Sequence, residues 1–420
     1  GGHAAARGGS VDGGAGDDTF VLSAGQDTII SGGGTDTLEV GAGYKLEGMA
    51  VDRTTGDLNF DFSDGSGGKH QVKISGQDTS PVTTLKLLKS DGSAEEFSLL
   101  VTQDPAGTFT AATDHPTKIA GSAEADVIIG GGGDDQVFAN EGDDIIDGGG
   151  GNDRLVGGIG DDTFKASDGI DTIVSGVGSD TLEISDRYTL DSVVLNSTSG
   201  DLNFTLMSKA DNGIHKVTVE GHQAAQLSVL RVHSDETTFK DFSLEVQDQG
   251  GGSYIAKTDN PTFMVGTDAV SGETLRGGDG SDVFLGNAGN DTQYGMGGDD
   301  TFKVSDGDDF IISGDGDDIL EIGAQYSIEK IETLDNDQQK FTMWKSDDTS
   351  YHSVTVDEIS TLRIYDNDGS FEDLSLQVIT KDADDNVIKD ADGKPVIQAA
   401  TDTSTLMVGA AAGERLIGGG

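Results

Sequence analysis

Residues 121–183 read GSAEADVII GGGGDDQVF ANEGDDIID GGGGNDRLV GGIGDDTFK ASDGIDTIV SGVGSDTLE, which is seven copies of a nonapeptide G-G-x-G-x-D-x-U-x with U apolar. Six further copies occupy 268–321 and three occupy 13–39. Across these sixteen copies the sixth position is Asp except for Glu273, and the eighth is apolar except for Gln293. One such motif is weak evidence, but sixteen in phase predict a repetitive fold.

Each position of the nonapeptide has a physical role. The glycines permit positive φ and close backbone approach, so the first six residues can form a tight turn whose carbonyls point inward. The last three residues form a short strand whose middle side chain faces a core. Two nonapeptides then make one coil of 18 residues, and copies of the same parity stack. The core side chains predicted for the middle block are Ile128, Val137, Ile146, Leu155, Phe164, Ile173 and Leu182.

The stacked coils would place the position-six carboxylates in two columns. In the middle block one column holds Asp126, Asp144, Asp162 and Asp180, and the other holds Asp135, Asp153 and Asp171. Stacked carboxylates in a wall of low dielectric constant repel one another unless a cation lies between successive turns. Carboxylate and carbonyl oxygens are hard ligands, and Ca²⁺ accepts about 6 to 8 of them in flexible geometry. The chain contains no Cys, so it offers no thiolate to a softer metal.

These nonapeptides resemble the RTX family, whose calcium-binding repeats wind into a parallel β-roll. The resemblance implies several Ca²⁺ ions per block, held between neighbouring coils by position-six carboxylates and by backbone carbonyls of the turn glycines. Copies that lack both turn glycines, at Leu22-Ser23 and Ala139-Asn140, are expected to bind more loosely. The implied metal ligands are Asp18, Asp27, Asp36, Asp126, Asp135, Asp144, Asp153, Asp162, Asp171, Asp180, Glu273, Asp282, Asp291, Asp300, Asp309 and Asp318, with Gly131, Gly133, Gly149, Gly151, Gly158, Gly160, Gly278, Gly280 and Gly298.

The segments between the nonapeptide blocks form a second repeat. They align with one another, so that Tyr44, Tyr188 and Tyr326 correspond. Runs such as HQVKI, HKVTV and HSVTV alternate apolar and polar residues and predict antiparallel strands. Each run begins with an equivalent histidine, which we interpret as a residue at a strand edge and not as a metal ligand; these are His70, His215 and His352.

We therefore expect an all-β chain in which parallel β-roll blocks alternate with small antiparallel β-sheet or sandwich segments, as three tandem modules in an elongated rod. The expected domains are a partial roll block at 1–39, segment 1 at 40–120, a roll block at 121–183, segment 2 at 184–265, a roll block at 266–321, segment 3 at 322–408, and the start of another roll block at 409–420.

The two ends of the chain suggest how units could join. The quartet DDTF recurs at intervals of 144 and 138 residues, and joining two copies end to end would repeat the 138-residue interval. Residues 413–420, GERLIGGG, are similar to GETLRGG at 272–278. This favours a head-to-tail homopolymer or tandem repeats of one longer chain, and a heterologous contact that does not close yields a filament. An arbitrary boundary is the alternative.

The net charge and the absence of catalytic motifs limit the classes of function that we expect for the chain. Asp plus Glu total 76 against 26 Lys plus Arg, a net charge of -50, so nucleic acid and anionic membranes are improbable partners. No apolar run approaches the length of a membrane span. The sequence contains no H-E-x-x-H, G-x-S-x-G, Walker loop or Cys nucleophile, so we expect no enzymatic activity.

The expected function is that of a calcium-dependent extracellular structural protein, part of a bacterial surface layer, a biofilm matrix filament or a long adhesin. Carboxylate repulsion should keep the blocks unfolded where Ca²⁺ is scarce, and Ca²⁺ binding should fold them after secretion. The resemblance implies type I secretion. One alternative is the repeat region of an RTX toxin or hydrolase whose active domain lies elsewhere. Another is a carbohydrate-binding adhesive module, with a cell-surface polysaccharide as partner.

Overall fold

The computed structural model describes residues 9–77, 81–104, 106–222, 227–334, 338–346, 350–366 and 370–376, and the backbone alone of short strands at 3–5, 378–379, 396–399 and 415–417. Within these residues there is no helix, and so none that could span a membrane. The chain forms two compact units, one of residues 1–192 with 199–240 and the other of 193–198 with 241–420. The roll block expected at 409–420 lies outside the described residues, apart from one strand backbone.

The first roll and segment 1 share two sheets of five strands, in the orders β1-β3-β5-β9-β10 and β2-β4-β8-β7-β6. Parallel pairing links the roll strands to β8 and β9, and antiparallel pairing links those to the remaining segment strands. The strands are β1 (His3–Ala5), β2 (Ser10–Asp12), β3 (Thr19–Val21), β4 (Gln26–Ile30), β5 (Asp36–Val40), β6 (Tyr44–Asp52), β7 (Asp57–Asp64), β8 (Lys69–Ile74), β9 (Val82–Leu88) and β10 (Ala94–Ser98).

The second roll and segment 2 repeat this plan in sheets of order β11-β12-β14-β16-β18-β20-β24-β25 and β13-β15-β17-β19-β23-β22-β21. The strands are β11 (Val101–Gln103), β12 (Thr108–Ala111), β13 (Lys118–Ala120), β14 (Val127–Ile129), β15 (Gln136–Glu141), β16 (Ile145–Asp147), β17 (Arg154–Ile159), β18 (Thr163–Lys165), β19 (Ile170–Val177), β20 (Asp180–Ile184), β21 (Tyr188–Leu195), β22 (Leu202–Ser208), β23 (Ile214–Val219), β24 (Leu227–His233) and β25 (Phe239–Ser243).

The third roll and segment 3 form sheets of order β26-β27-β29-β31-β33-β37-β36-β35 and β28-β30-β32-β34-β38-β39, and a small sheet β40-β41-β42 follows. The strands are β26 (Val246–Asp248), β27 (Ser253–Ala256), β28 (Phe263–Val265), β29 (Thr274–Arg276), β30 (Val283–Leu285), β31 (Thr292–Gly297), β32 (Thr301–Lys303), β33 (Asp308–Asp315), β34 (Ile319–Ile322), β35 (Tyr326–Thr333), β36 (Gln339–Lys345), β37 (Tyr351–Asp357), β38 (Thr361–Tyr365), β39 (Phe371–Ser375), β40 (Val378–Ile379), β41 (Val396–Ala399) and β42 (Arg415–Ile417).

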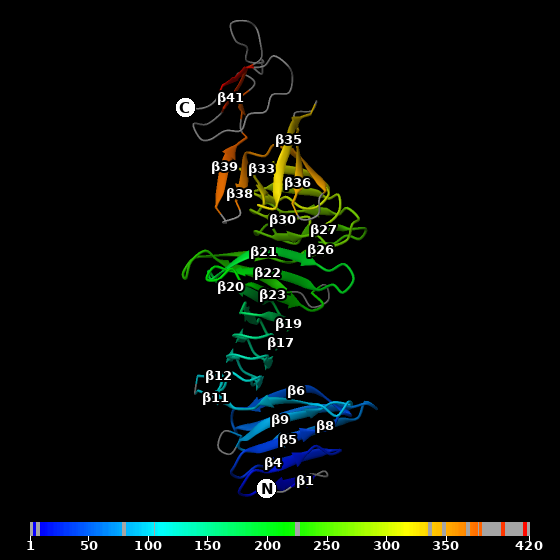
Figure 1. The fold of residues 1–420 in the computed structure, drawn as a ribbon, viewed down its shortest axis with the longest axis vertical. Helices are drawn as coiled ribbons and strands as arrows, with labels where there is room; N and C mark the ends of the chain where they lie inside the picture. The colour runs from blue at the N-terminus through cyan, green and yellow to red at the C-terminus, as the bar shows by residue number, and fades with distance from the viewer. Residues whose placement is uncertain are drawn as a thin grey trace. The chain divides into compact units, whose positions relative to one another are not determined.

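The register of the middle roll confirms the predicted 18-residue coil. Val137 pairs with Leu155, which pairs with Ile173 two strands along the sheet. The coils therefore stack directly, as the strands around β17 and β19 show in Figure 1. All seven side chains predicted for the roll core are buried: Ile128, Val137, Ile146, Leu155, Phe164, Ile173 and Leu182.

Each segment continues the sheets of the roll before it. In the first module, Phe20 and Leu38 of the roll pack in the same apolar cluster as Phe60 and Ile74 of segment 1. The boundary expected between 39 and 40 thus falls inside continuous sheets and one apolar cluster. The expected segments 1 and 2 each end in strands that belong to the sheets of the following roll, which are β11 to β13 and β26 to β28. The expected all-β fold of parallel rolls with antiparallel segments is confirmed.

The roll core predicts a contrast between two substitutions on one strand. Leu155 is 1% exposed and Ile159 is 57% exposed, and both lie on β17. Leu155→Ala should lower the free energy of unfolding in saturating Ca²⁺ by about 2–5 kcal/mol, because it leaves a cavity in the core. Ile159→Ala should change it by less than about 0.5 kcal/mol. Denaturant titration of both variants measures this, and equal losses would contradict the core assignment.

Candidate metal sites

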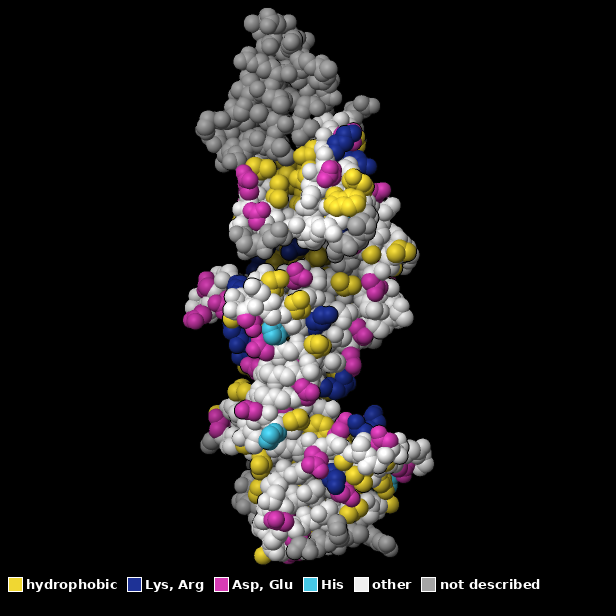
Figure 2. Space-filling model, in the orientation of Figure 1, with side chains coloured by type: hydrophobic (Ala, Val, Ile, Leu, Met, Phe, Trp, Pro, Cys, Tyr) yellow, Lys and Arg dark blue, Asp and Glu magenta, His cyan; other side chains and the backbone are white. Residues whose placement is uncertain are grey.

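The structure buries every carboxylate that the sequence assigned to the columns. Acidic side chains visible in Figure 2 are scattered over the surface, whereas these sixteen lie inside the rolls with at most 8% of the side chain exposed. They are Asp18, Asp27, Asp36, Asp126, Asp135, Asp144, Asp153, Asp162, Asp171, Asp180, Glu273, Asp282, Asp291, Asp300, Asp309 and Asp318. Such a concentration of buried carboxylates requires compensation.

A ladder of hydrogen bonds aligns the carboxylates in each column. The backbone N–H of Asp126 donates to Oδ1 of Asp144 (2.7 Å), and that of Asp144 donates to Oδ1 of Asp162 (3.0 Å). In the other column the N–H of Asp135 donates to Oδ1 of Asp153 (2.9 Å). The third roll repeats the ladder, for example from Asp282 to Asp300 at 2.8 Å. The bond uses one carboxylate oxygen and fixes where the other points.

The second oxygen is left without a partner in the interior turns. The buried position-six Oδ2 atoms with no hydrogen bond include those of Asp135, Asp144, Asp153, Asp162, Asp291 and Asp300. A buried oxygen without a partner is costly, and native structures rarely retain one without a water or an ion. These oxygens, spaced one per coil, fit a cation.

The electrostatics of the columns agree with this geometry. Burial, reinforced by neighbouring carboxylates, raises the pKa of Asp135, Asp153 and Asp162 to about 7. Burial together with the charge of Asp143 does the same for Asp144. For Asp300, burial together with Asp282 and Asp318 raises the pKa to about 8. Without a metal, the columns would therefore hold protons near neutral pH.

The turn glycines let successive coils approach closely. A Cβ on Gly149, which has φ +91°, would lie 2.0 Å from the carbonyl oxygen of Gly131. Position-one glycines lie beside the free carboxylate oxygen, since a Cβ on Gly148 would lie 2.2 Å from Oδ2 of Asp153. The predicted glycines with positive φ are Gly131, Gly133, Gly149, Gly151, Gly158, Gly160 and Gly298.

Gly278 and Gly280 play a different part from the other predicted glycines. Neither has a positive φ, but a Cβ on either would lie 2.7 Å from the backbone of the preceding loop, at Thr258 and at Asn260. Close approach, not a left-handed conformation, therefore requires glycine at these two positions.

The structure also shows a ladder that the sequence analysis missed. At position five of the repeat, Oδ1 of Asp134 accepts the backbone N–H of Asn152 (2.8 Å), and Oδ1 of Asn152 accepts that of Ile170 (2.9 Å). This ladder is exposed and runs opposite to the position-six ladder. Asp or Asn occupies position five in many copies, which was the available signal. Where both ladders are present, they link a turn to the next one through two backbone-to-carboxylate or backbone-to-amide hydrogen bonds.

In the final coil of one column of each roll, a serine of the same repeat donates a hydrogen bond to the position-six carboxylate. A serine at position two donates to Oδ2 of the position-six Asp, from Ser23 to Asp27 (3.1 Å), from Ser167 to Asp171 (2.9 Å) and from Ser305 to Asp309 (2.9 Å). The Leu22-Ser23 copy, expected to bind more loosely, is one of the three. In these coils a hydroxyl meets the oxygen that stays free in interior turns.

The donor set defines the kind of ion. Within the residues that the structure describes, no group of three or more His, Asp or Glu side chains converges as a metal cluster. A cation would instead be held by one or two carboxylates per turn together with turn carbonyls. That all-oxygen set suits Ca²⁺.

Comparison with known proteins agrees with this class of repeat. The family model described as RTX calcium-binding nonapeptide repeat (4 copies) matches residues 12–44, 120–155, 147–182, 271–302 and 294–326. The chain therefore carries RTX calcium-binding nonapeptide repeats, and such repeats bind calcium.

Other comparisons are distant. No curated protein matches the chain. Among solved structures, the chain is similar to the extracellular lipase LipA from Serratia marcescens at 19% identity, with 53% of this chain and 38% of the lipase covered and a TM-score of 0.19. The chain thus spans well under half the length of that lipase.

Adjacent glycines provide a test of the stacked turns. Gly149→Ala should destabilise the calcium-loaded protein by well over about 1 kcal/mol, because φ is positive and the Cβ would strike the coil below. At Gly150 φ is not positive and the nearest atom to a Cβ is 4.0 Å away, so Gly150→Ala should be nearly neutral. Calcium titration followed by circular dichroism compares them. Equal tolerance would contradict the stacking.

The raised pKa values predict how pH affects the metal-free protein. Because the pKa of Asp135, Asp153 and Asp162 is raised to about 7 by burial, their contribution to stability is present below about pH 4 and is lost as pH rises through 7. Metal-depleted protein should therefore be more ordered at pH 4 than at pH 8. Circular dichroism and thermal melting across this range check it, and the reverse order would contradict it.

Proposed function

We propose that the chain is a calcium-dependent extracellular structural protein. The observation that carries the proposal is the ladder of buried carboxylates with unpartnered oxygens, built in the same way in roll after roll. The roll and segment plan recurs in three modules with equivalent strands. A spacer repeats in this way, whereas an active site usually occurs once.

The calcium dependence gives a reason for an extracellular location. With the columns empty, the buried carboxylates oppose coiling at neutral pH. Ca²⁺ binds the coiled form and stabilises it by mass action, so folding follows the free Ca²⁺ concentration. A chain that stays uncoiled in the cytoplasm and coils outside the cell suits type I secretion.

The structural role that we propose is a surface layer, matrix filament or long adhesin. Segment 1 continues the sheets of the first roll through β6 to β10, and its last strands, β11 to β13, lie in the sheets of the middle roll. The hairpin of segment 1 also contacts the start of the middle roll, through Val51 and Arg53. The same contacts made between copies of the chain would join them head to tail.

Removal of calcium should unfold the rolls. At pH 8, excess EGTA should abolish most of the β-sheet circular dichroism and increase the hydrodynamic radius, and added Ca²⁺ should restore both. Mg²⁺ at the same concentration should not restore them, because it prefers rigid octahedral sites and keeps its waters. A spectrum and radius unchanged by EGTA would overturn the proposal.

The same samples test assembly. In Ca²⁺, electron micrographs should show filaments with a regular axial repeat, and EGTA should disperse them. Scattered single particles in Ca²⁺ would overturn the head-to-tail part of the proposal and leave calcium-dependent folding to be judged by the spectra.

A further inference from the structure

The last coil of each roll lacks a following coil to complete its hydrogen bonds. In interior turns the N–H at position four donates to a carbonyl of the next coil, as from Gly142 to Ile159 (2.8 Å). In the last coil of the middle roll, the N–H of Gly169 donates instead to Nδ1 of His215 (2.8 Å). The imidazole nitrogen thus stands where the next coil would place a carbonyl oxygen.

The same ending occurs in all three modules. The N–H of Gly25 donates to Nδ1 of His70 (3.0 Å), and that of Gly307 donates to Nδ1 of His352 (2.9 Å). Each histidine lies in the first segment strand that joins the roll sheet, which is β8, β23 or β37. The three equivalent histidines, interpreted from sequence as strand-edge residues, therefore end the rolls.

The surroundings of His70 hold its imidazole in an accepting orientation. The ring packs edge-on against Tyr44, the tyrosine that is equivalent between the modules, with ring centroids 5.1 Å apart. Nε2 of His70 lies 2.9 Å from Asp64. An imidazole that accepts at Nδ1 carries its proton at Nε2, where this carboxylate can receive it. The equivalent rings in the other modules lie 5.5 and 5.9 Å from their tyrosines.

The first coil of the middle roll has the opposite deficit. Each Oδ1 in the column accepts a backbone N–H from the coil before it, but the strand before Asp126 is β12, and there the N–H of Gly107 donates to the carbonyl of Asp104 instead (3.2 Å). The guanidinium of Arg53 contacts Oδ1 of Asp126 as an ion pair. It also bonds Glu124 (2.7 Å) and the carbonyl of Ala125 (3.2 Å). A donor from segment 1 thus stands where an earlier coil would place its amide.

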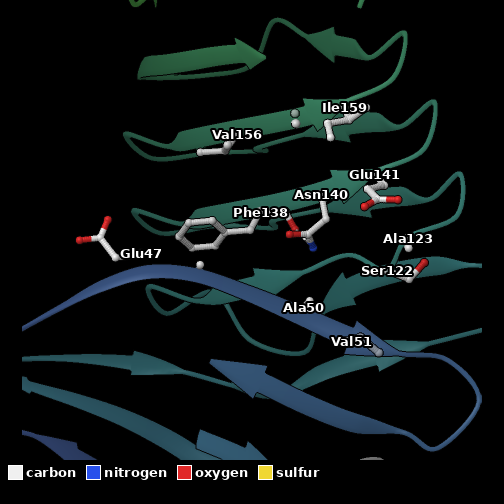
Figure 3. A pocket seen from close by; sticks show the side chains of 13 residues that line it. Glu47, Ala50, Val51, Ser122, Ala123, Phe138, Asn140, Glu141, Val156 and Ile159 are labelled. Carbon is white, nitrogen blue, oxygen red and sulfur yellow. Dashed lines mark hydrogen bonds between the residues drawn. The ribbon is translucent and has the colours of Figure 1, made fainter. Parts of the chain in front are cut away.

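The hairpin that carries Arg53 is fixed to this end of the roll. The N–H of Val51 in β6 donates to the carbonyl of Gly121 (2.9 Å). Figure 3 shows β6 passing beneath the coils of the roll, with Ala50 and Val51 near Ser122. A groove of about 470 Å³ beside this contact is lined by β6 and by the outer faces of β15 and β17.

The third roll begins with a different solution to the same deficit. At the position of Arg53 in the aligned hairpin stands Ser197, whose hydroxyl donates to Asp268 (2.6 Å). The first carboxylate is Glu273, and its longer side chain accepts from the backbone N–H of Thr267 (2.7 Å) and from the hydroxyl of the same residue. In the middle roll the equivalent Ser122 donates its N–H and its hydroxyl to Oδ2 of Asp126 (2.7 and 3.0 Å). The longer Glu273 meets these two donors with both carboxylate oxygens, whereas Asp126 meets them with one and leaves Oδ1 to Arg53.

We propose that Arg53 and His215 are the two end caps of the middle roll, a donor at its start and an acceptor at its end, and that they couple calcium binding in this roll to both flanking segments. The inference rests on the calcium-dependent folding proposed above. Arg53 neutralises Asp126, so the calcium-binding turns of this column begin at Asp144. The arrangement parallels the capping of helix ends, where side chains satisfy backbone groups that the repeat leaves open.

Calcium titration of the full chain at pH 8 tests the caps. Arg53→Ala and His215→Ala should each raise the Ca²⁺ midpoint for folding of the middle roll by roughly tenfold or more, since each strands a buried partner. His215→Ala should also speed hydrogen exchange of the Gly169 amide at saturating Ca²⁺. Arg53→Lys and His215→Asn, which keep a cation and an acceptor, should recover much of the midpoint.

Matched controls separate capping from general effects. Arg154→Ala removes a half-exposed arginine of the same roll, which forms a surface ion pair with Glu220, and His115→Ala removes an exposed loop histidine. Both should leave the midpoint nearly unchanged, because surface ion pairs contribute little to stability. The capping role is refuted if the wild type folds with Ca²⁺ but both capping variants keep its midpoint. It is also refuted if the control variants shift the midpoint as far as the capping variants do. In either case the proposed function stands. If the wild type shows no calcium-dependent folding, the proposed function itself fails.

Discussion

The hydrogen bond from each position-six amide to the carboxylate 18 residues later governs the architecture of the rolls. It holds successive coils at a constant spacing, as where the backbone N–H of Asp135 donates to Oδ1 of Asp153 over an N to O distance of 2.9 Å. It also buries a charged group and leaves one of its oxygens unsatisfied. A polar group buried in this way normally costs stability unless a partner compensates. A cation between the coils would supply that partner, and the need for one follows from the backbone geometry itself.

The glycines and the extreme charge follow from the same constraint. Successive turns stack backbone on backbone, and a Cβ on Gly149 would lie 2.0 Å from the carbonyl of Gly131. Only glycine allows that approach together with a positive φ. A net charge of -50 would make most chains poorly foldable. Here part of that charge is arranged as columns of buried carboxylates, so cation binding would offset the repulsion that otherwise opposes folding.

The sequence revealed the features that repeat locally and missed those that depend on distant partners. The 18-residue coil, the core and the two columns follow from the nonapeptide period alone, and the structure confirms them. The position-five ladder escaped notice because its exposed residues vary among Asp, Asn and others. His215 lies 46 residues along the chain from its partner Gly169, and Arg53 lies 73 residues from its partner Asp126. They depend on how segment strands join a roll, which no local pattern encodes.

The alternation of rolls and segments has a physical rationale. The outermost strands of a parallel coil expose unpaired amides and carbonyls at both ends, because hydrogen bonds between coils run in both directions, as from Gly142 to Ile159 and from Gly150 to Gly131. Open strand edges of this kind invite pairing with other chains. The segments continue the sheets with antiparallel strands, and their side chains close the ladder, as Gly169 and His215 show. Each roll is thereby kept short and bounded. A long uninterrupted roll would coil one repeat at a time, because each repeat contacts only its neighbours. Bounded rolls with capped ends should instead respond to calcium as separate cooperative units.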